Sequence, residues 1–115
     1  METAFLLIVD DNRDSAVSLA TLVQMSDNMV EIANDGMQAV QRAPTYQPHI
    51  IVLDIGLPNM SGYDVCRAIR EQSWSKGVAI VALSGWGQDE HRRKSKEAGF
   101  DAHLVKPVDY DAVDE

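Results

Sequence analysis

The sequence predicts an α/β protein whose parallel sheet is covered by helices on both faces. Short, wholly apolar runs recur along the chain, amphipathic or charge-paired stretches separate them, and this alternation occurs five times without a linker or repeat. Strands that are apolar on both faces are typical of buried parallel sheets. Alternating strands and helices favour right-handed crossovers between parallel neighbours. We therefore expect a doubly wound (βα)5 sandwich.

The first strand and helix lie at the N-terminal end. Residues 4–9 are all apolar and are followed by Asp10, and so short a run indicates a buried strand. The next apolar residues recur at helical spacing: Ala16, Leu19, Ala20 and Val23. A second, weaker strand is expected over residues 30–33.

A short second helix is expected to begin at Asp35-Gly36. Asp35 can cap it, because Gln38 stands three residues later as in a capping box. The inner face would carry three apolar side chains, Met37, Val40 and Ala43. Pro44 has no backbone N–H and is expected to end the helix.

Two more strands and a third helix follow. Residues 50–53 and 78–83 are apolar and precede Asp54 and Ser84. Between them, Ser61 with Asp64 three residues later indicates a helix start. The apolar stripe of this helix would be Val65, Ala68 and Ile69, with Tyr63 packing at its start and Cys66 filling the core.

The last strand and two polar helices complete the pattern. Residues 88–98 pair acids with bases at i, i+4, which supports a helix that Gly99 would terminate. Residues 102–105 form the fifth strand. A final helix of about two turns is expected near Asp109. Its shortness fits a domain cut from a longer chain, although a stand-alone domain would also start near Met1.

Length and charge restrict the possible functions. With 115 residues, 45% of them hydrophobic, residues 1–115 suit a single domain. A formal net charge of −8 disfavours direct binding to nucleic acid. The single cysteine excludes an intrachain disulfide, and no run approaches the roughly 20 apolar residues of a membrane span or looks like a signal peptide. We expect a cytoplasmic domain without membrane contact.

Polar residues follow four of the five expected strands. Ligands of open parallel sheets bind beyond the carboxyl ends of the strands. The residues at those ends are Asp10 and Asp11, Asp54, Ser84 and Lys106. Each alone has an ordinary explanation, as a helix cap, a turn residue or a solvated lysine. Their joint occurrence at four strand ends favours a common site.

These groups suit phosphoryl transfer. Neighbouring carboxylates repel one another unless a cation lies between them, and Mg²⁺, for which Mn²⁺ can substitute, prefers oxygen ligands and often shares a phosphate group. Transfer requires positioning and charge neutralisation, to which the metal and Lys106 would contribute. Ser84 would donate a hydrogen bond to a phosphoryl oxygen. Asp54 would be the nucleophile, since carboxylates form acyl phosphates.

On these residues the chain resembles the receiver domains of two-component response regulators over essentially its whole length. The segments that carry the resemblance are residues 8–12, 53–62, 82–85 and 105–107. The resemblance implies a flavodoxin-like fold with sheet order 2-1-3-4-5 and phosphorylation on Asp54. It also implies Mg²⁺ held by Asp11, Asp54 and the backbone carbonyl of Gly56, with Asp10 assisting.

The resemblance assigns further residues around the acceptor. Ser84 and Lys106, which Pro107 follows, would contact the phosphoryl group. Ser84 would also form a conformational switch with His103, where the family more often has tyrosine or phenylalanine; an exposed strand histidine is the alternative. Trp86 would flank the path of the hydrolytic water, contact a partner or merely cover the loop.

The predicted function is a phosphorelay signalling domain rather than an enzyme. A histidine kinase or a histidine phosphotransfer domain would be the phosphoryl donor, and the domain would assist its own phosphorylation and dephosphorylation. Residues 85–88 and 98–109 look like receivers fused to hybrid sensor histidine kinases. The face made by the helix over 88–98, the strand over 102–105 and the final helix would be the output surface and could pair transiently with a second copy.

Three other functions fit the sequence less well. A haloacid-dehalogenase-type phosphatase needs a second Asp where Gly56 stands and a cap domain. A flavodoxin needs a phosphate loop rich in Ser and Thr after the first strand, where Asp10 and Asp11 would repel the flavin phosphate. A pseudo-receiver that binds proteins without being phosphorylated stays the main alternative, and the complete acidic set argues against it.

Overall fold

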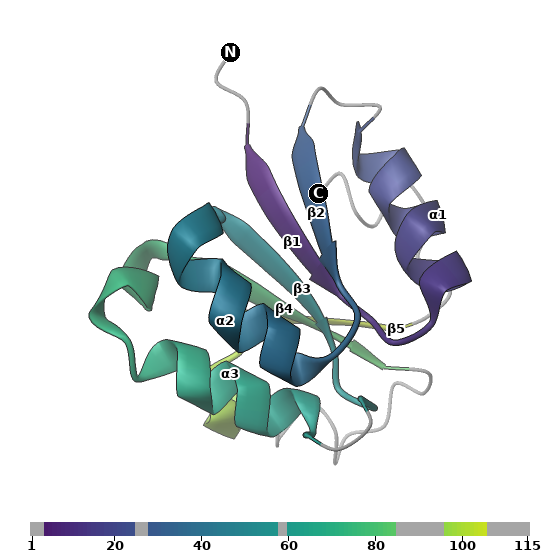
Figure 1. The fold of residues 1–115 in the computed structure, drawn as a ribbon. Coiled ribbons are helices and arrows are strands. Elements are labelled where there is room, and N and C mark those ends of the chain that lie inside the picture. The colour runs from purple at the N-terminus through teal and green to yellow at the C-terminus, as the bar shows by residue number, and fades with distance from the viewer. Residues whose placement is uncertain (1–3, 25–27, 58–59, 85–95, 106–115) are drawn as a thin grey trace.

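The computed structural model describes residues 4–24, 28–57, 60–84 and 96–105. Five parallel strands form one sheet in the order β2-β1-β3-β4-β5. Helix α1 covers one face of this sheet, and helices α2 and α3 cover the other (Figure 1). The predicted class, the doubly wound arrangement and the strand order 2-1-3-4-5 are confirmed.

The strands lie within one residue of the predicted runs. They are β1 (Phe5–Val9), β2 (Met29–Ala33), β3 (Ile50–Asp54), β4 (Ala79–Ser84) and β5 (Ala102–Val105). The helical elements are α1 (Arg13–Gln24), α2 (Gly36–Tyr46), α3 (Gly62–Arg70) and the 3-10 helix η1 (Ser73–Gly77). The sequence pattern did not predict η1. Residues 96–98 are helical, and the rest of the helix expected over 88–98 and the final helix lie outside the described residues.

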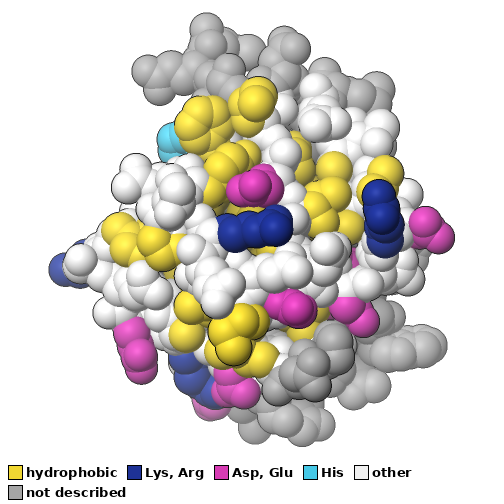
Figure 2. Space-filling model, in the orientation of Figure 1, with side chains coloured by type: hydrophobic (Ala, Val, Ile, Leu, Met, Phe, Trp, Pro, Cys, Tyr) yellow, Lys and Arg dark blue, Asp and Glu magenta, His cyan; other side chains and the backbone are white. Residues whose placement is uncertain are grey.

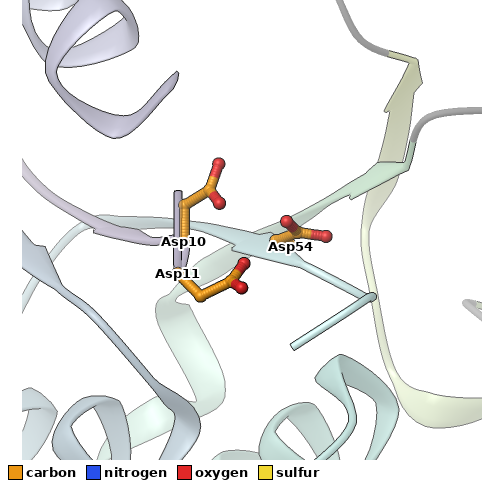
Figure 3. Close-up of side chains that lie close together, drawn as sticks. All are labelled: Asp10, Asp11 and Asp54. Carbon is orange, nitrogen blue, oxygen red and sulfur yellow. The ribbon is translucent and has the colours of Figure 1, made fainter. Parts of the chain in front are cut away.

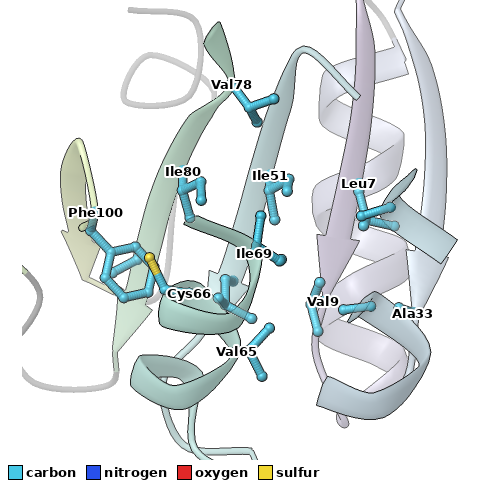
Figure 4. Close-up of a cluster of buried hydrophobic side chains, with 14 of the residues drawn as sticks. Leu7, Val9, Ala33, Ile51, Val65, Cys66, Ile69, Val78, Ile80 and Phe100 are labelled. Carbon is cyan, nitrogen blue, oxygen red and sulfur yellow. The ribbon is translucent and has the colours of Figure 1, made fainter. Parts of the chain in front are cut away.

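Two hydrophobic clusters hold the layers together. One joins the sheet to α2 and α3 and includes Leu7, Ile51 and Ile69, all fully buried (Figure 4). The other joins the sheet to α1 through Ile8, Ala16, Leu19, Ala20, Val52 and Leu83. Successive residues of β1 point to opposite faces, so Leu7 and Ile8 belong to different clusters. This fixes the register of β1 and, with it, the position of the residues that follow the strand.

Two predictions about α2 (Gly36–Tyr46) are wrong. Met37 is 61% exposed, and the buried residues of the helix are Gly36, Ala39 and Ala43. These small side chains let α2 lie close to α3; a Cβ on Gly36 would stand 2.5 Å from Val65 Cγ2. Pro44 lies inside the helix and does not end it. It sits in the last turn, where its missing N–H costs the helix only one hydrogen bond.

The predicted caps of α2 and α3 are confirmed. Asp35 accepts a hydrogen bond from Gln38 N at 2.8 Å. Ser61 Oγ accepts one from Asp64 N at 3.3 Å. Gly99 has a φ of 106°, the left-handed conformation expected just past a helix end. In the predicted stripe of α3, Val65 and Ile69 are buried and Ala68 is half-buried.

The end of α3 is joined to the start of β5 by Arg70. Its guanidinium donates to the carbonyls of Gly99 at 3.0 Å, Ser75 at 2.8 Å and Val78 at 2.9 Å, and it pairs with the carboxylate of Asp101. The same carboxylate accepts a hydrogen bond from Ile80 N at 2.8 Å. One side chain therefore fastens α3, η1, β4 and the turn into β5 together.

Strand β2 forms one edge of the sheet. Met29 N donates to Ala4 O, and Ala33 O accepts from Asp10 N, so these residues of β2 face β1. The backbone groups of successive strand residues point alternately to the two sides, so the carbonyl of Ile32 points away from β1 to the open edge of the sheet. Arg42 Nη1 donates a hydrogen bond to this carbonyl at 3.0 Å. Tyr46 donates its hydroxyl proton to Met29 O at 3.2 Å. Two side chains of α2 thus bond to the backbone of β2.

The surface carries a few exposed apolar side chains, of which Phe5 and Met29 are register partners on β1 and β2. Among the described residues, the large hydrophobic side chains that are exposed are Phe5, Val17, Met29 and Met37. On the face in Figure 2, the apolar side chains form several small groups, and charged side chains lie between some of these groups. In the part of the chain that the structure describes, no helix has the length and apolar character needed to cross a bilayer.

Candidate functional site

The acidic residues predicted at the strand ends lie together. Asp10 and Asp11 follow β1 directly, and Asp54 is the last residue of β3. The two strands are neighbours in the sheet, with Val9 in register with Leu53. One carboxylate oxygen from each of the three residues lies within 4.8 Å of the others (Figure 3). Parallel strands place their carboxyl ends on one rim, and this geometry produces the cluster.

Backbone N–H groups orient two of the carboxylates. Asp10 Oδ1 accepts from Asn12 N at 3.0 Å, and Asp54 Oδ1 accepts from Gly56 N at 2.8 Å. Asp10 is 1% exposed and Asp54 is 8% exposed, whereas Asp11 is exposed. The cluster is therefore built on two buried, oriented groups and is open to solvent on the side of Asp11.

The turn after β3 is tied to the rest of the fold. Ile55 N donates to Leu83 O in β4 at 3.0 Å, and Gly62 N donates to Ile55 O at 3.2 Å. The residue that follows β3 and the first residue of α3 are therefore hydrogen-bonded to each other. Gly56, whose carbonyl was predicted as a metal ligand, lies in this turn and is exposed.

The donor set fits a hard divalent cation. Three carboxylates within 4.8 Å of one another, two of them buried, supply only oxygen atoms. Mg²⁺ favours oxygen ligands and commonly uses one or two carboxylates with water and a phosphate group. A cation also offsets the repulsion between carboxylates held so close together.

The other predicted site residues are placed only in part. The backbone of Ser84 ends β4 at the same rim, in register with Val105, and its side chain is outside the description. His103 lies on β5, half-buried and in register with Ala82. Trp86, Lys106 and Pro107 lie outside the described residues. The structure thus brings together Asp10, Asp11 and Asp54.

Cys66 is in the core and is not a candidate nucleophile. It is fully buried in α3, as predicted. Burial raises the pKa of its thiol from 9.0 to about 11, and the nearby Arg70 guanidinium only partly opposes this. A thiol needs its thiolate form to react, so Cys66 has a structural role.

Two tertiary contacts were not predicted from the sequence. Arg70 and Asp101 are 31 residues apart, and no local pattern pairs them. Gly62 packs directly on the backbone of Asp54, and the only signal in the sequence was a glycine at a helix start. Both contacts depend on tertiary structure rather than on residue spacing.

Comparison with known proteins identifies one family for this chain. Residues 6–115 match the family described as the response regulator receiver domain. The chain is 37% identical over 102 residues to the transcriptional regulatory protein CusR of Escherichia coli and 33% identical to the response regulator MprA of Mycobacterium leprae. Each match covers 89% of the chain and 44% of the relative, so the chain spans about half the length of these proteins.

Solved structures show the same fold. The chemotaxis protein CheY4 of Vibrio cholerae superposes with a TM-score of 0.92 at 28% identity, covering 97% of this chain and 93% of that one. The receiver domain of the sensor histidine kinase PA1611 of Pseudomonas aeruginosa gives 0.89 at 27% identity, covering 98% and 93%. The latter structure has a magnesium ion coordinated in its active site cleft.

Proposed function

The chain belongs to the response regulator receiver family, and on that premise we propose that it accepts a phosphoryl group on Asp54 from a histidine kinase or a histidine phosphotransfer domain. The observation that carries the proposal is the cluster of Asp10, Asp11 and Asp54 at the carboxyl ends of β1 and β3. The family match supports the reaction, and the cluster supplies the residues for it.

The proposed metal is Mg²⁺, with Mn²⁺ able to replace it. Asp11, Asp54 and the Gly56 carbonyl would hold it, and Asp10 would assist. When bound, Mg²⁺ would supply positive charge to offset that of the phosphoryl oxygens. The magnesium ion in the PA1611 receiver supports this assignment by analogy.

In the proposed reaction, a carboxylate oxygen of Asp54 attacks phosphorus. The P–N bond of the phosphohistidine donor breaks, its electron pair goes to the imidazole nitrogen, and an acyl phosphate forms on Asp54. The bond from Gly56 N to Asp54 Oδ1 restricts rotation of the carboxylate and so orients its second oxygen before reaction. Hydrolysis by water later restores the carboxylate.

The remaining predicted residues complete the proposal. Ser84 and Lys106 would contact the phosphoryl group, and the end of β4 at the same rim supports this role for Ser84. Ser84 and His103 would form the switch, because β4 and β5 are neighbours and His103 is half-buried. Trp86 and Pro107 would flank the site.

We further propose that residues 1–115 are one receiver domain that works in the cytoplasm within a longer signalling protein. The relatives CusR and MprA are more than twice as long as the matched segment. The PA1611 likeness supports a hybrid kinase as the context, whereas the names of CusR and its relatives support a transcriptional regulator. In either case the domain itself would not bind nucleic acid, given a net charge of −8. The surface of β5 and the helices flanking it would be the output face and would pair transiently.

Intact-mass spectrometry tests the acceptor. The wild type, Asp54→Asn and the control Asp64→Asn are incubated with acetyl phosphate and Mg²⁺. Asp64 is an exposed carboxylate on α3, outside the acidic cluster. We expect one added phosphoryl group on the wild type and on Asp64→Asn, none on Asp54→Asn, and none after the metal is chelated.

Two results would contradict the proposal. Labelling of Asp54→Asn would place the acceptor elsewhere. Wild-type protein that neither accepts phosphate nor binds beryllofluoride would instead support a protein-binding module that is not phosphorylated.

A further inference from the structure

Gly62 stands where no side chain fits. A Cβ on this residue would lie 2.5 Å from Ile55 Cα, 2.6 Å from Asp54 O and 3.1 Å from the carbonyl carbon of Asp54. Real Cβ atoms essentially never approach other heavy atoms closer than 3.0 Å. All three neighbours are backbone atoms, so no change of rotamer relieves the overlap. Among the described residues, Gly99 is the glycine with positive φ, so Gly62 is required for space and not for its backbone conformation.

The atoms that Gly62 touches belong to the acceptor and to the residue after it. Asp54 is held at its side chain by Gly56 N, and the next peptide is held by Leu83 O. The start of α3 closes the remaining side, through the hydrogen bond from Gly62 N to Ile55 O and the direct contact with Asp54 O. The position of α3 is therefore transmitted to the backbone of Asp54 without an intervening side chain.

We infer that Gly62 is a positioning residue, which sets the place of the Asp54 carboxylate and the Gly56 carbonyl by letting α3 rest on their turn. The inference rests on the function proposed above. In Gly62→Ala, the distance from Cβ to Asp54 O must grow from 2.6 Å to at least 3.0 Å, a displacement of about 0.4 Å or more. Mg²⁺ demands near-ideal octahedral geometry at about 2.0–2.1 Å, so a displacement of this size disturbs its ligands.

Two other glycines provide matched controls. A Cβ on Gly36 would stand 2.5 Å from Val65 Cγ2, an overlap as severe as at Gly62 but with the end of a side chain. A Cβ on Gly77 would meet nothing within 4 Å. The Gly36 Cβ would also meet Cβ and Sδ of Met60 at 3.4 Å, which is ordinary van der Waals contact. Gly36→Ala therefore disturbs packing against side chains and not against the backbone of Asp54 or Ile55, and Gly77→Ala adds the same methyl group in open space.

The experiment combines thermal unfolding with titration of each protein by MgCl₂, followed through backbone amide NMR shifts. We expect Gly62→Ala to bind Mg²⁺ about 10- to 100-fold more weakly than the wild type, the size typical of groups that support metal ligands. Before metal is added, its Gly56 amide resonance should already be shifted. Gly36→Ala should unfold at a lower temperature yet keep the wild-type affinity, and Gly77→Ala should keep both.

Other results separate this inference from the proposed function. Wild-type affinity in folded Gly62→Ala, or an equal loss in Gly36→Ala, would overturn the positioning role and leave the metal site intact. If the amide resonances near Asp54 of the wild type do not shift when Mg²⁺ is added, the proposed metal site itself is wrong. If Gly62→Ala does not fold, the titration of the wild type alone tests the inference. The amide resonances of Gly62 and Gly56 should then shift with the same apparent affinity for Mg²⁺. An unmoved Gly62 resonance would contradict the inference.

Discussion

Replacing Arg70 by alanine should cost this protein several times more stability than the same change at Arg67. The two arginines lie one turn apart on α3. Arg67 forms an exposed ion pair with Asp64 at 3.2 Å, which is worth at most about 0.5 kcal/mol. Arg70 donates to three backbone carbonyls, each bond contributing about 1 kcal/mol, and its pair with the half-exposed Asp101 adds about 0.5 kcal/mol. The expected loss for Arg70→Ala is therefore about 3–4 kcal/mol.

Urea denaturation of the wild type and both variants measures these losses as differences in the free energy of unfolding. Asp101→Asn refines the test, because an amide oxygen can still accept from Ile80 N and only the charge is removed; about 1 kcal/mol should be lost. A cost for Arg70→Ala below about 1 kcal/mol, close to that of Arg67→Ala, would show that water replaces the guanidinium at these carbonyls and would refute the reasoning.

Three further predictions concern the core and the metal. The pKa of Cys66 is raised from 9.0 to about 11, so its contribution to stability is complete below pH 9 and is lost as the pH rises toward 11. Over this range the free energy of unfolding of the wild type should fall by up to about 3 kcal/mol more than that of Cys66→Ala. Parallel curves of unfolding free energy against pH for the two proteins would contradict this. The Tyr63 hydroxyl is buried and has no hydrogen-bond partner in the described part of the chain, so Tyr63→Phe should unfold at higher urea, with a gain of about 1 kcal/mol; a less stable variant would reveal a hidden partner. Mg²⁺ should raise the unfolding temperature of the wild type, and EDTA should reverse this; an equal rise in Asp11→Asn would place the metal elsewhere.

The sequence was sufficient for the sheet and for the acidic cluster. Strands β1 and β3 are short apolar runs, and the residue after each run marks the rim, so Asp10 and Asp54 could be located without knowledge of any contact. The order of the strands came from the family resemblance rather than from the apolar runs. The strand-end argument assigns Ser84 and Lys106 to the phosphoryl group, and only the family resemblance assigns His103 to a switch. All three roles stay predictions.

Tertiary packing explains the positions that the sequence pattern did not predict correctly. Met37 is apolar, which predicts an inner position, but the fully buried positions of α2, where it lies close to α3, carry the small residues Gly36, Ala39 and Ala43. Val40 is half-buried and packs against the same core. Pro44 was expected to end the helix, yet a proline in the last turn loses little. The hydrogen bonds of Arg70 join residues up to 31 positions apart, which no helical or strand period encodes.

The contacts along β2 bear on how this domain can associate. A bare outer strand is a template on which an extended segment of another chain can form hydrogen bonds, and it is a common origin of aggregation. Here Arg42 already occupies the outward carbonyl of Ile32. Its guanidinium must leave before an added strand can bond to this carbonyl, so strand addition at this point of β2 is disfavoured. Contacts through side chains elsewhere on the surface need no such displacement. Such contacts can be broken quickly, as a transient signal requires.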